Sequence, residues 1–184
     1  SDGQAATGWR AAAPRWLGVA AAVAMAFYAY AFYTGDLNLR LAGGSLTLAA
    51  IVGFYAWIVV QMRGSILSTP RLGMFAAATT LTIGAALGVM LGIWLKGGLK
   101  FLPDGIFVTH PTTMVVGYLV LAGMALSEWR LDPGSAQKPA SKAGWAQVIL
   151  PFVGGLVLTA GALTNNQMVI GSTSRSRSSA SSFI

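Results

Sequence analysis

Residues 104–130 read DGIFVTHPTTMVVGYLVLAGMALSEWR, and this stretch decides the fold class. Between its terminal charged residues it holds an apolar run about as long as a helix that crosses a bilayer, roughly 20 residues. It also contains the single histidine of the chain, His110, directly before Pro111. We therefore predict a membrane-spanning helix over residues 111–129, with Thr109 or His110 as its N-cap and the proline in its first turn.

The composition of the whole chain agrees with this reading. Of its 184 residues, 55% are hydrophobic and only 9% are charged, whereas soluble domains carry about 25% charged residues. A soluble fold of this size could not bury so much apolar surface, so the excess must face lipid. Every Asp, Glu, Lys and Arg falls between the apolar runs or at their edges. The sequence predicts an all-α, polytopic integral membrane bundle.

Four further apolar runs have membrane length, which gives about five predicted transmembrane helices. An N-terminal tail precedes them, and a polar segment that is rich in Ser and Arg follows them. In chain order the predicted segments are the tail 1–15, the spans 16–33, 43–62, 72–95, 111–129 and 145–163, and the polar segment 164–184.

The polar segment, which ends STSRSRSSASSFI, has two interpretations. Such a composition is typical of a disordered tail. Alternatively, one choice of GC-rich codons for this run reads as an apolar segment in the shifted frame. In that case a sixth span is lost at the C-terminus, and the coding DNA decides between the two.

The basic residues predict the orientation, because Lys and Arg collect on the cytoplasmic side of membrane proteins. The side of the amino terminus would hold Arg10, Arg15, Arg63, Arg71, Arg130, Lys138 and Lys142. The other side would hold Arg40, Lys96, Lys100, Arg175 and Arg177. We therefore predict a multi-pass protein of the cell (inner) membrane with a cytoplasmic amino terminus, which places His110 near the outer face. The net charge of +7 belongs to these flanks and does not predict nucleic-acid binding.

Gly84, Gly88 and Gly92 follow one another at every fourth position of the third predicted span. Glycines with this spacing fall near one helix face and let a neighbouring backbone approach closely. The face could pack on a helix of the same chain, on a second copy, or on a flat cofactor. The predicted partners are the lipid bilayer together with other membrane subunits or a homo-oligomeric copy.

Several kinds of chemistry can be excluded. Without cysteine the chain offers no thiolate metal site, and with one histidine it cannot supply two His ligands to a haem. No charged residue lies inside a predicted span, which argues against a proton relay. The threonines Thr79, Thr80, Thr82 and Thr159 are expected to bond back to their own helix rather than to line a polar path. The chain contains no catalytic constellation, which argues against an enzyme.

His110 is the remaining candidate. It either caps its helix at the membrane surface or serves as a ligand to haem or a metal, with Met114 one turn along on the same face. The preferred interpretation is a subunit of a membrane redox or respiratory assembly with haem or a metal at His110. Two alternatives remain open: a component of a permease for a small neutral solute, and a membrane anchor or assembly protein without a small-molecule site.

Overall fold

A computed structural model of the chain describes residues 9–164, with side chains described from residue 12 onward. The two interpretations of the polar tail concern residues 165–184 and lie outside the described residues. The elements are α1 (Trp9–Thr34), α2 (Leu37–Met62), α3 (Thr69–Leu95), α4 (Ile106–Thr112), the π-helix η1 (Thr113–Leu119), α5 (Val120–Leu131), the 3₁₀ helix η2 (Pro133–Gln137) and α6 (Lys142–Leu163).

The predicted all-α membrane bundle is confirmed. Five helical stretches of residues 9–164 are long and apolar enough to cross a membrane. One of them, Ile106–Leu131, is a single continuous helix made of α4, η1 and α5. All the elements that the described residues form are helical.

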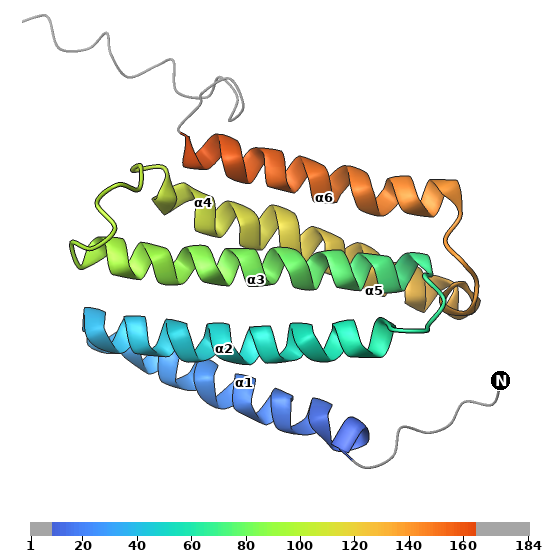
Figure 1. Cartoon of the computed structure of the whole chain (residues 1–184), viewed down its shortest axis with the longest axis horizontal. Helices are drawn as coiled ribbons and strands as arrows, with labels where there is room; N and C mark the ends of the chain where they lie inside the picture. Colours follow the sequence, from blue (N-terminus) through green and yellow to red (C-terminus); the bar gives the residue numbers. More distant parts are fainter. Residues whose placement is uncertain (1–8, 165–184) are drawn as a thin grey trace, which may run out of the picture.

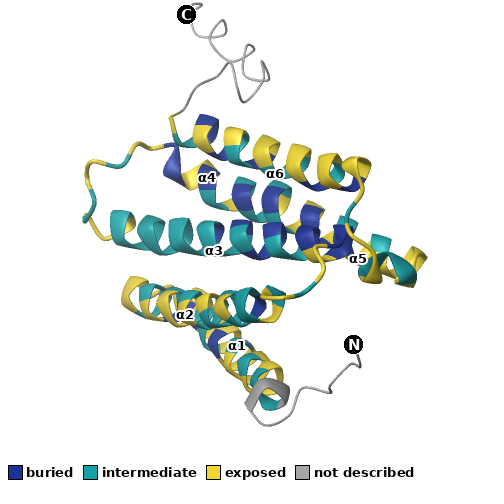
Figure 2. Ribbon diagram, turned by 45° about the vertical axis from the view of Figure 1, so that its right-hand side comes forward, coloured by how far each residue is buried: buried dark blue, intermediate teal, exposed yellow. Residues whose placement is uncertain are grey.

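The helices lie roughly side by side in a layered row (Figure 1). In this row α1 packs on α2, α2 packs on α3, and α3 packs on the continuous helix α4–η1–α5 and on α6. The buried residues gather where α3, α5 and α6 meet (Figure 2). The core cluster there consists of Leu72, Ala76, Ala77, Leu121, Ala122 and Val148. Because α1 and α2 bury little, most of their side chains are available to lipid.

The helix α2 begins before the predicted span 43–62. Asp36 caps it, since its carboxylate accepts the N–H groups of Asn38 and Leu39 at 2.7 and 3.3 Å. Arg40, which lies between the predicted spans 16–33 and 43–62, is therefore in the first turn of α2. Its guanidinium donates to the Phe32 carbonyl at 3.2 Å, which ties the ends of α1 and α2 together.

Smaller differences concern α1 and α6. The predicted tail 1–15 is partly helical, because α1 begins at Trp9. The helix α6 begins at Lys142, where the Ser141 hydroxyl accepts the Gly144 N–H at 3.1 Å. It continues as one helix through Pro151.

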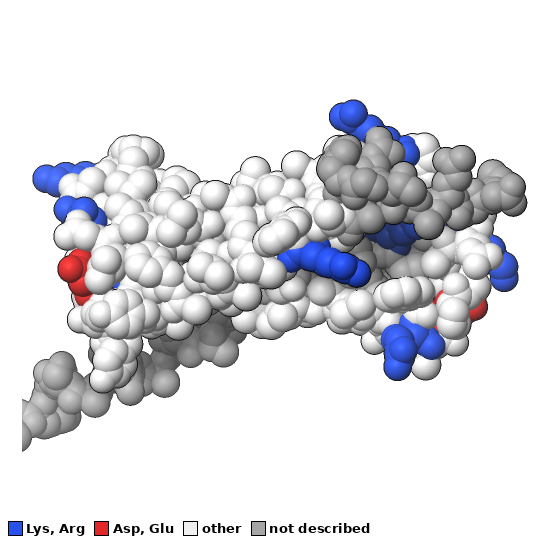
Figure 3. Space-filling model, turned by 90° about the horizontal axis from the view of Figure 1, so that it is seen from below, with Lys and Arg blue, Asp and Glu red and all other residues white. Residues whose placement is uncertain are grey.

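Most Lys and Arg side chains visible in Figure 3 lie toward the two ends of the elongated body. More of them appear at the right-hand end, where the α2–α3 and α5–α6 connections lie (Figures 1 and 3). A broad band with few charges separates the two ends, as expected for a surface in contact with hydrocarbon.

Candidate functional site

The candidate residue His110 lies inside a helix. The prediction that Thr109 or His110 caps this helix is wrong, because α4 begins at Ile106. The helix follows directly from a turn, in which the Ile106 N–H donates to the Pro103 carbonyl at 3.1 Å. Pro111 is therefore an interior residue of α4.

The interior proline is followed directly by a change of helix type. Pro111 has no N–H to offer to the carbonyl one turn before it, and its ring crowds that carbonyl. After Thr112, which ends α4, the seven residues Thr113–Leu119 form the π-helix η1. Short π segments inside α-helices are rare and occur frequently at functional sites. This wider turn lies just beyond His110.

The imidazole of His110 is held against α3. Its Nδ1 lies 2.7 Å from the Gly84 carbonyl oxygen. The ring fills the space left open by Gly88, since a Cβ added there would lie 2.9 Å from Cε1 and 3.0 Å from Nδ1. The glycine pair therefore sets both the position and the direction of the ring.

This contact determines which nitrogen carries the proton. A carbonyl oxygen only accepts hydrogen bonds, so Nδ1 must donate to Gly84. In the neutral imidazole, Nε2 then keeps its lone pair. Among the described residues Nε2 of His110 has no hydrogen-bond partner, and it is not among the fully buried unpartnered atoms. Nε2 is therefore not fully enclosed, although it also faces Gly88, where an added Cβ would lie 3.4 Å from it.

Met114 also packs on α3, one turn along from His110. A Cβ added at Gly84 would lie 2.7 Å from its sulfur, so the structure brings both candidate residues against the same glycine. Gly92 does not join them, since its open side faces Leu41 of α2 at 3.3 Å. Side chains of this chain thus occupy the face of Gly84 and Gly88, which leaves no room there for a flat cofactor or a second copy.

The described chain does not complete a metal site. Among residues 9–164, no group of three or more His, Cys, Asp and Glu side chains is placed to hold a metal ion. Such side chains therefore do not assemble three ligands at His110 within these residues, whereas a haem iron needs only one or two axial ligands.

A buried threonine pair lies deeper in the bundle. Thr113 Oγ and Thr159 Oγ are 2.8 Å apart, and each also lies 2.8 Å from a carbonyl oxygen of its own helix. Each hydroxyl has one proton, so the threonine that donates to the other hydroxyl does not donate to its own helix carbonyl, and either threonine can be that donor. The threonines of α3 bond back to their own helix, as expected, with partners Phe75, Ala76, Ala77 and Ala78. They give no support to a polar path.

We expect Thr159→Val to lower the free energy of unfolding by about 0.6 kcal/mol and by no more than about 1.7 kcal/mol. The substitution keeps the shape but removes the hydroxyl that contacts Thr113. Thr82→Val is the matched control, because Thr82 bonds only to its own helix at Ala78. Titration with a denaturing detergent, followed by circular dichroism, measures both. Equal losses would show that the contact between the helices adds nothing.

Prediction from sequence missed other close contacts of this region. A Cβ added at Gly117 would lie 2.9 Å from Thr80 Cβ, and one added at Gly155 would lie 3.4 Å from Gly117 Cα. The helices α3, η1 and α6 therefore meet closely at Gly117. Gly117 lies in the π-helix η1 and is not part of the regular glycine series of the third predicted span.

Compared with known proteins, the chain matches no protein-family model, and no match is found among curated proteins or solved structures.

Proposed function

We propose that this chain is a non-catalytic subunit of a membrane redox assembly and that His110 offers one ligand to a haem or metal. The assembly lies in the cell membrane, with the amino terminus of the chain in the cytoplasm and His110 toward the outer face. The observation that supports the site is the hydrogen bond from Nδ1 to the Gly84 carbonyl at 2.7 Å. Histidines that bind metals commonly donate their second ring N–H to such an acceptor, which fixes the tautomer and the ring direction.

The surroundings of the ring favour a fixed ligand over a mobile surface group. His110 is part-buried, and its ring rests on Gly88 with little space to rotate. Met114 packs its thioether against Gly84, so in this proposal it supports the pocket beside the ring. A single proximal His can hold a haem iron, so the isolated chain can bind haem through His110, and in the assembly a second ligand comes from another subunit.

Two substitutions of His110 separate a ligand from a structural contact. In His110→Asn the amide nitrogen takes the place of Nδ1 and can still donate to the Gly84 carbonyl, but nothing replaces Nε2. In His110→Ala both are lost. A ligand role predicts that both variants lose the cofactor, whereas a role in helix contact alone predicts that the Asn variant behaves like the wild type.

The test is an absorption spectrum of the full chain purified in mild detergent, before and after addition of haem, oxidised and then reduced with dithionite. Metal analysis is done on the same sample. We expect a Soret band and a reduced α band that are absent from both His110 variants. A chain that binds neither haem nor metal in stoichiometric amount contradicts the proposal and favours an anchor or assembly protein.

A further inference from the structure

We propose a second site at the opposite end of the bundle from His110: a groove that binds one anionic phospholipid, with the phosphate at Arg71. The groove has a volume of about 650 Å³ and is lined by α2, α3, α5, η2 and the α2–α3 connection. This volume lies within the range of ligand pockets, roughly 300–1,000 Å³.

The packing of the helices explains why the groove exists. Among the described elements, α2 and α5 each pack on α3 but do not contact each other. The surface of α3 is therefore the floor of the groove, and the other two helices are its walls. Because α2, α3 and the continuous helix Ile106–Leu131 that contains α5 are long and apolar enough to cross a membrane, we expect the open side of the groove to face lipid chains.

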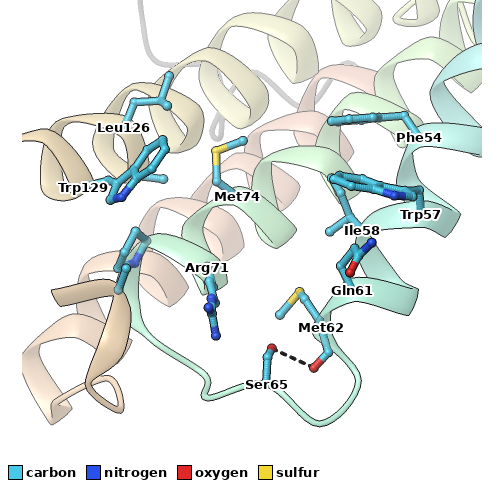
Figure 4. Close-up of a pocket in the computed structure, with 13 residues that line it drawn as sticks. Phe54, Trp57, Ile58, Gln61, Met62, Ser65, Arg71, Met74, Leu126 and Trp129 are labelled. Carbon is cyan, nitrogen blue, oxygen red and sulfur yellow. Dashed lines mark hydrogen bonds between the residues drawn. The ribbon is translucent and has the colours of Figure 1, made fainter. Parts of the chain in front are cut away.

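The inner part of the groove is apolar (Figure 4). Phe54 and Trp57 of α2 lie on one side, Leu126 and Trp129 of α5 lie on the other, and Met74 of α3 lies between them. Such a lining of aromatic and flexible aliphatic side chains suits a hydrocarbon chain. Tryptophans also commonly lie at the level of the lipid headgroups.

The polar side chains collect at one end of the groove, near the α2–α3 connection (Figure 4). The Ser65 hydroxyl donates its hydrogen bond to the Met62 carbonyl at 2.9 Å. Arg71 donates from Nη1 to the Ile66 carbonyl at 3.1 Å, which uses one of its five N–H groups. The exposed guanidinium keeps donors free, and its planar fork matches a phosphate group.

The charge around this end favours an anionic headgroup. The basic residues of the adjoining connections and helix ends are Arg63, Arg71, Arg130, Lys138 and Lys142, against the acidic residues Glu128 and Asp132. Basic residues beside a membrane attract anionic lipids. A ligand with one acidic end and a long apolar part matches a groove that is basic at one end and apolar along the rest. The bilayer holds such molecules next to the open side of the groove. The occupant is therefore a phospholipid and not a free anion.

Native mass spectrometry of the full chain in mild detergent tests the site by titration with phosphatidylglycerol, phosphatidylcholine or glycerol phosphate. We expect one molecule of phosphatidylglycerol to bind about fivefold more tightly than phosphatidylcholine. Arg71→Gln should remove this preference. Arg63→Gln should keep it, because Arg63 carries the same charge in the adjoining α2–α3 connection but does not line the groove.

A second pair of variants tests the apolar part. Leu126→Trp places a larger side chain in the groove and should weaken the binding of both lipids at least fivefold. Leu131→Trp, at a residue 87% exposed on the same helix, should leave the binding of both lipids unchanged. Circular dichroism confirms that each variant is folded. Equal binding of the two lipids to the wild type, or an unchanged preference in Arg71→Gln, overturns the proposal. Binding of glycerol phosphate as tight as that of phosphatidylglycerol overturns it as well, because the site would then recognise the phosphate group without the acyl chains.

Discussion

Gly105→Ala is expected to lower the free energy of unfolding by about 3 kcal/mol. Gly105 ends the α3–α4 connection and lies against the last turn of α6. An added Cβ would collide with the carbonyl oxygen of Ala162 and would lie 2.6 Å from that of Leu163. Both are backbone atoms, so no side-chain rotation can relieve the contact, and the two helix ends must separate.

The backbone conformation of Gly105 lets this substitution test the added volume alone. Its φ of −55° and ψ of −15° are open to alanine, so the substitution adds volume without backbone strain. Gly123→Ala is the control, because a Cβ there meets nothing within 4 Å and alanine favours the helix by about 0.5–1 kcal/mol. Thermal unfolding in detergent, followed by circular dichroism, should show a large loss for the first and none for the second. If Gly105→Ala unfolds like the wild type, α4 does not pack on the end of α6 as described.

Gly117→Ala is expected to lower the free energy of unfolding by about 2 kcal/mol. The new Cβ would lie 2.9 Å from Thr80 Cβ and 3.1 Å from its Cγ2. Thr80 is only 1% exposed, and its hydroxyl is bonded to the Ala76 and Ala77 carbonyls, so the threonine cannot rotate away cheaply. The helices α3 and η1 would have to move apart.

A neighbouring glycine supplies the control for this prediction. In α6, Gly155 approaches Gly117, whereas a Cβ added at Gly154 would meet nothing within 4 Å. Gly154→Ala should therefore leave the midpoint of unfolding unchanged or raise it slightly, while Gly117→Ala lowers it. A loss of similar size in both variants would mean that helix flexibility, and not the contact with Thr80, explains the effect of Gly117→Ala.

The helices α2 and α4 begin several residues before the predicted spans, although the sequence contains signals for both starts. Asp36 follows Gly35 directly and precedes an apolar segment, which is the pattern of an N-cap, whereas hydropathy predicts the span 43–62 only from residue 43. The start of α4 was placed by Pro111, because proline suits a first turn. The apolar residues Ile106, Phe107 and Val108 before it already belong to the helix.

The neighbours of the candidate residues could not be predicted in the same way. His110 and Met114 were expected on one face, but nothing in the spacing identified Gly84 as the residue they both meet. The regular glycine series likewise divides between two neighbours, because Gly92 faces Leu41 of α2. A spacing defines a helix face, whereas the partner of that face depends on the positions of the other helices.

The sequence by itself determined that the chain is an all-α membrane protein with five long apolar helices, because length and apolarity are local properties of each segment. Only the tertiary structure decided which nitrogen of His110 bonds to Gly84, where Gly105 and Gly117 allow helices to meet, and that α2 and α5 leave a groove over α3. Each of these depends on how residues far apart in the chain approach one another. Small differences in helix packing set those distances, and hydropathy does not record them.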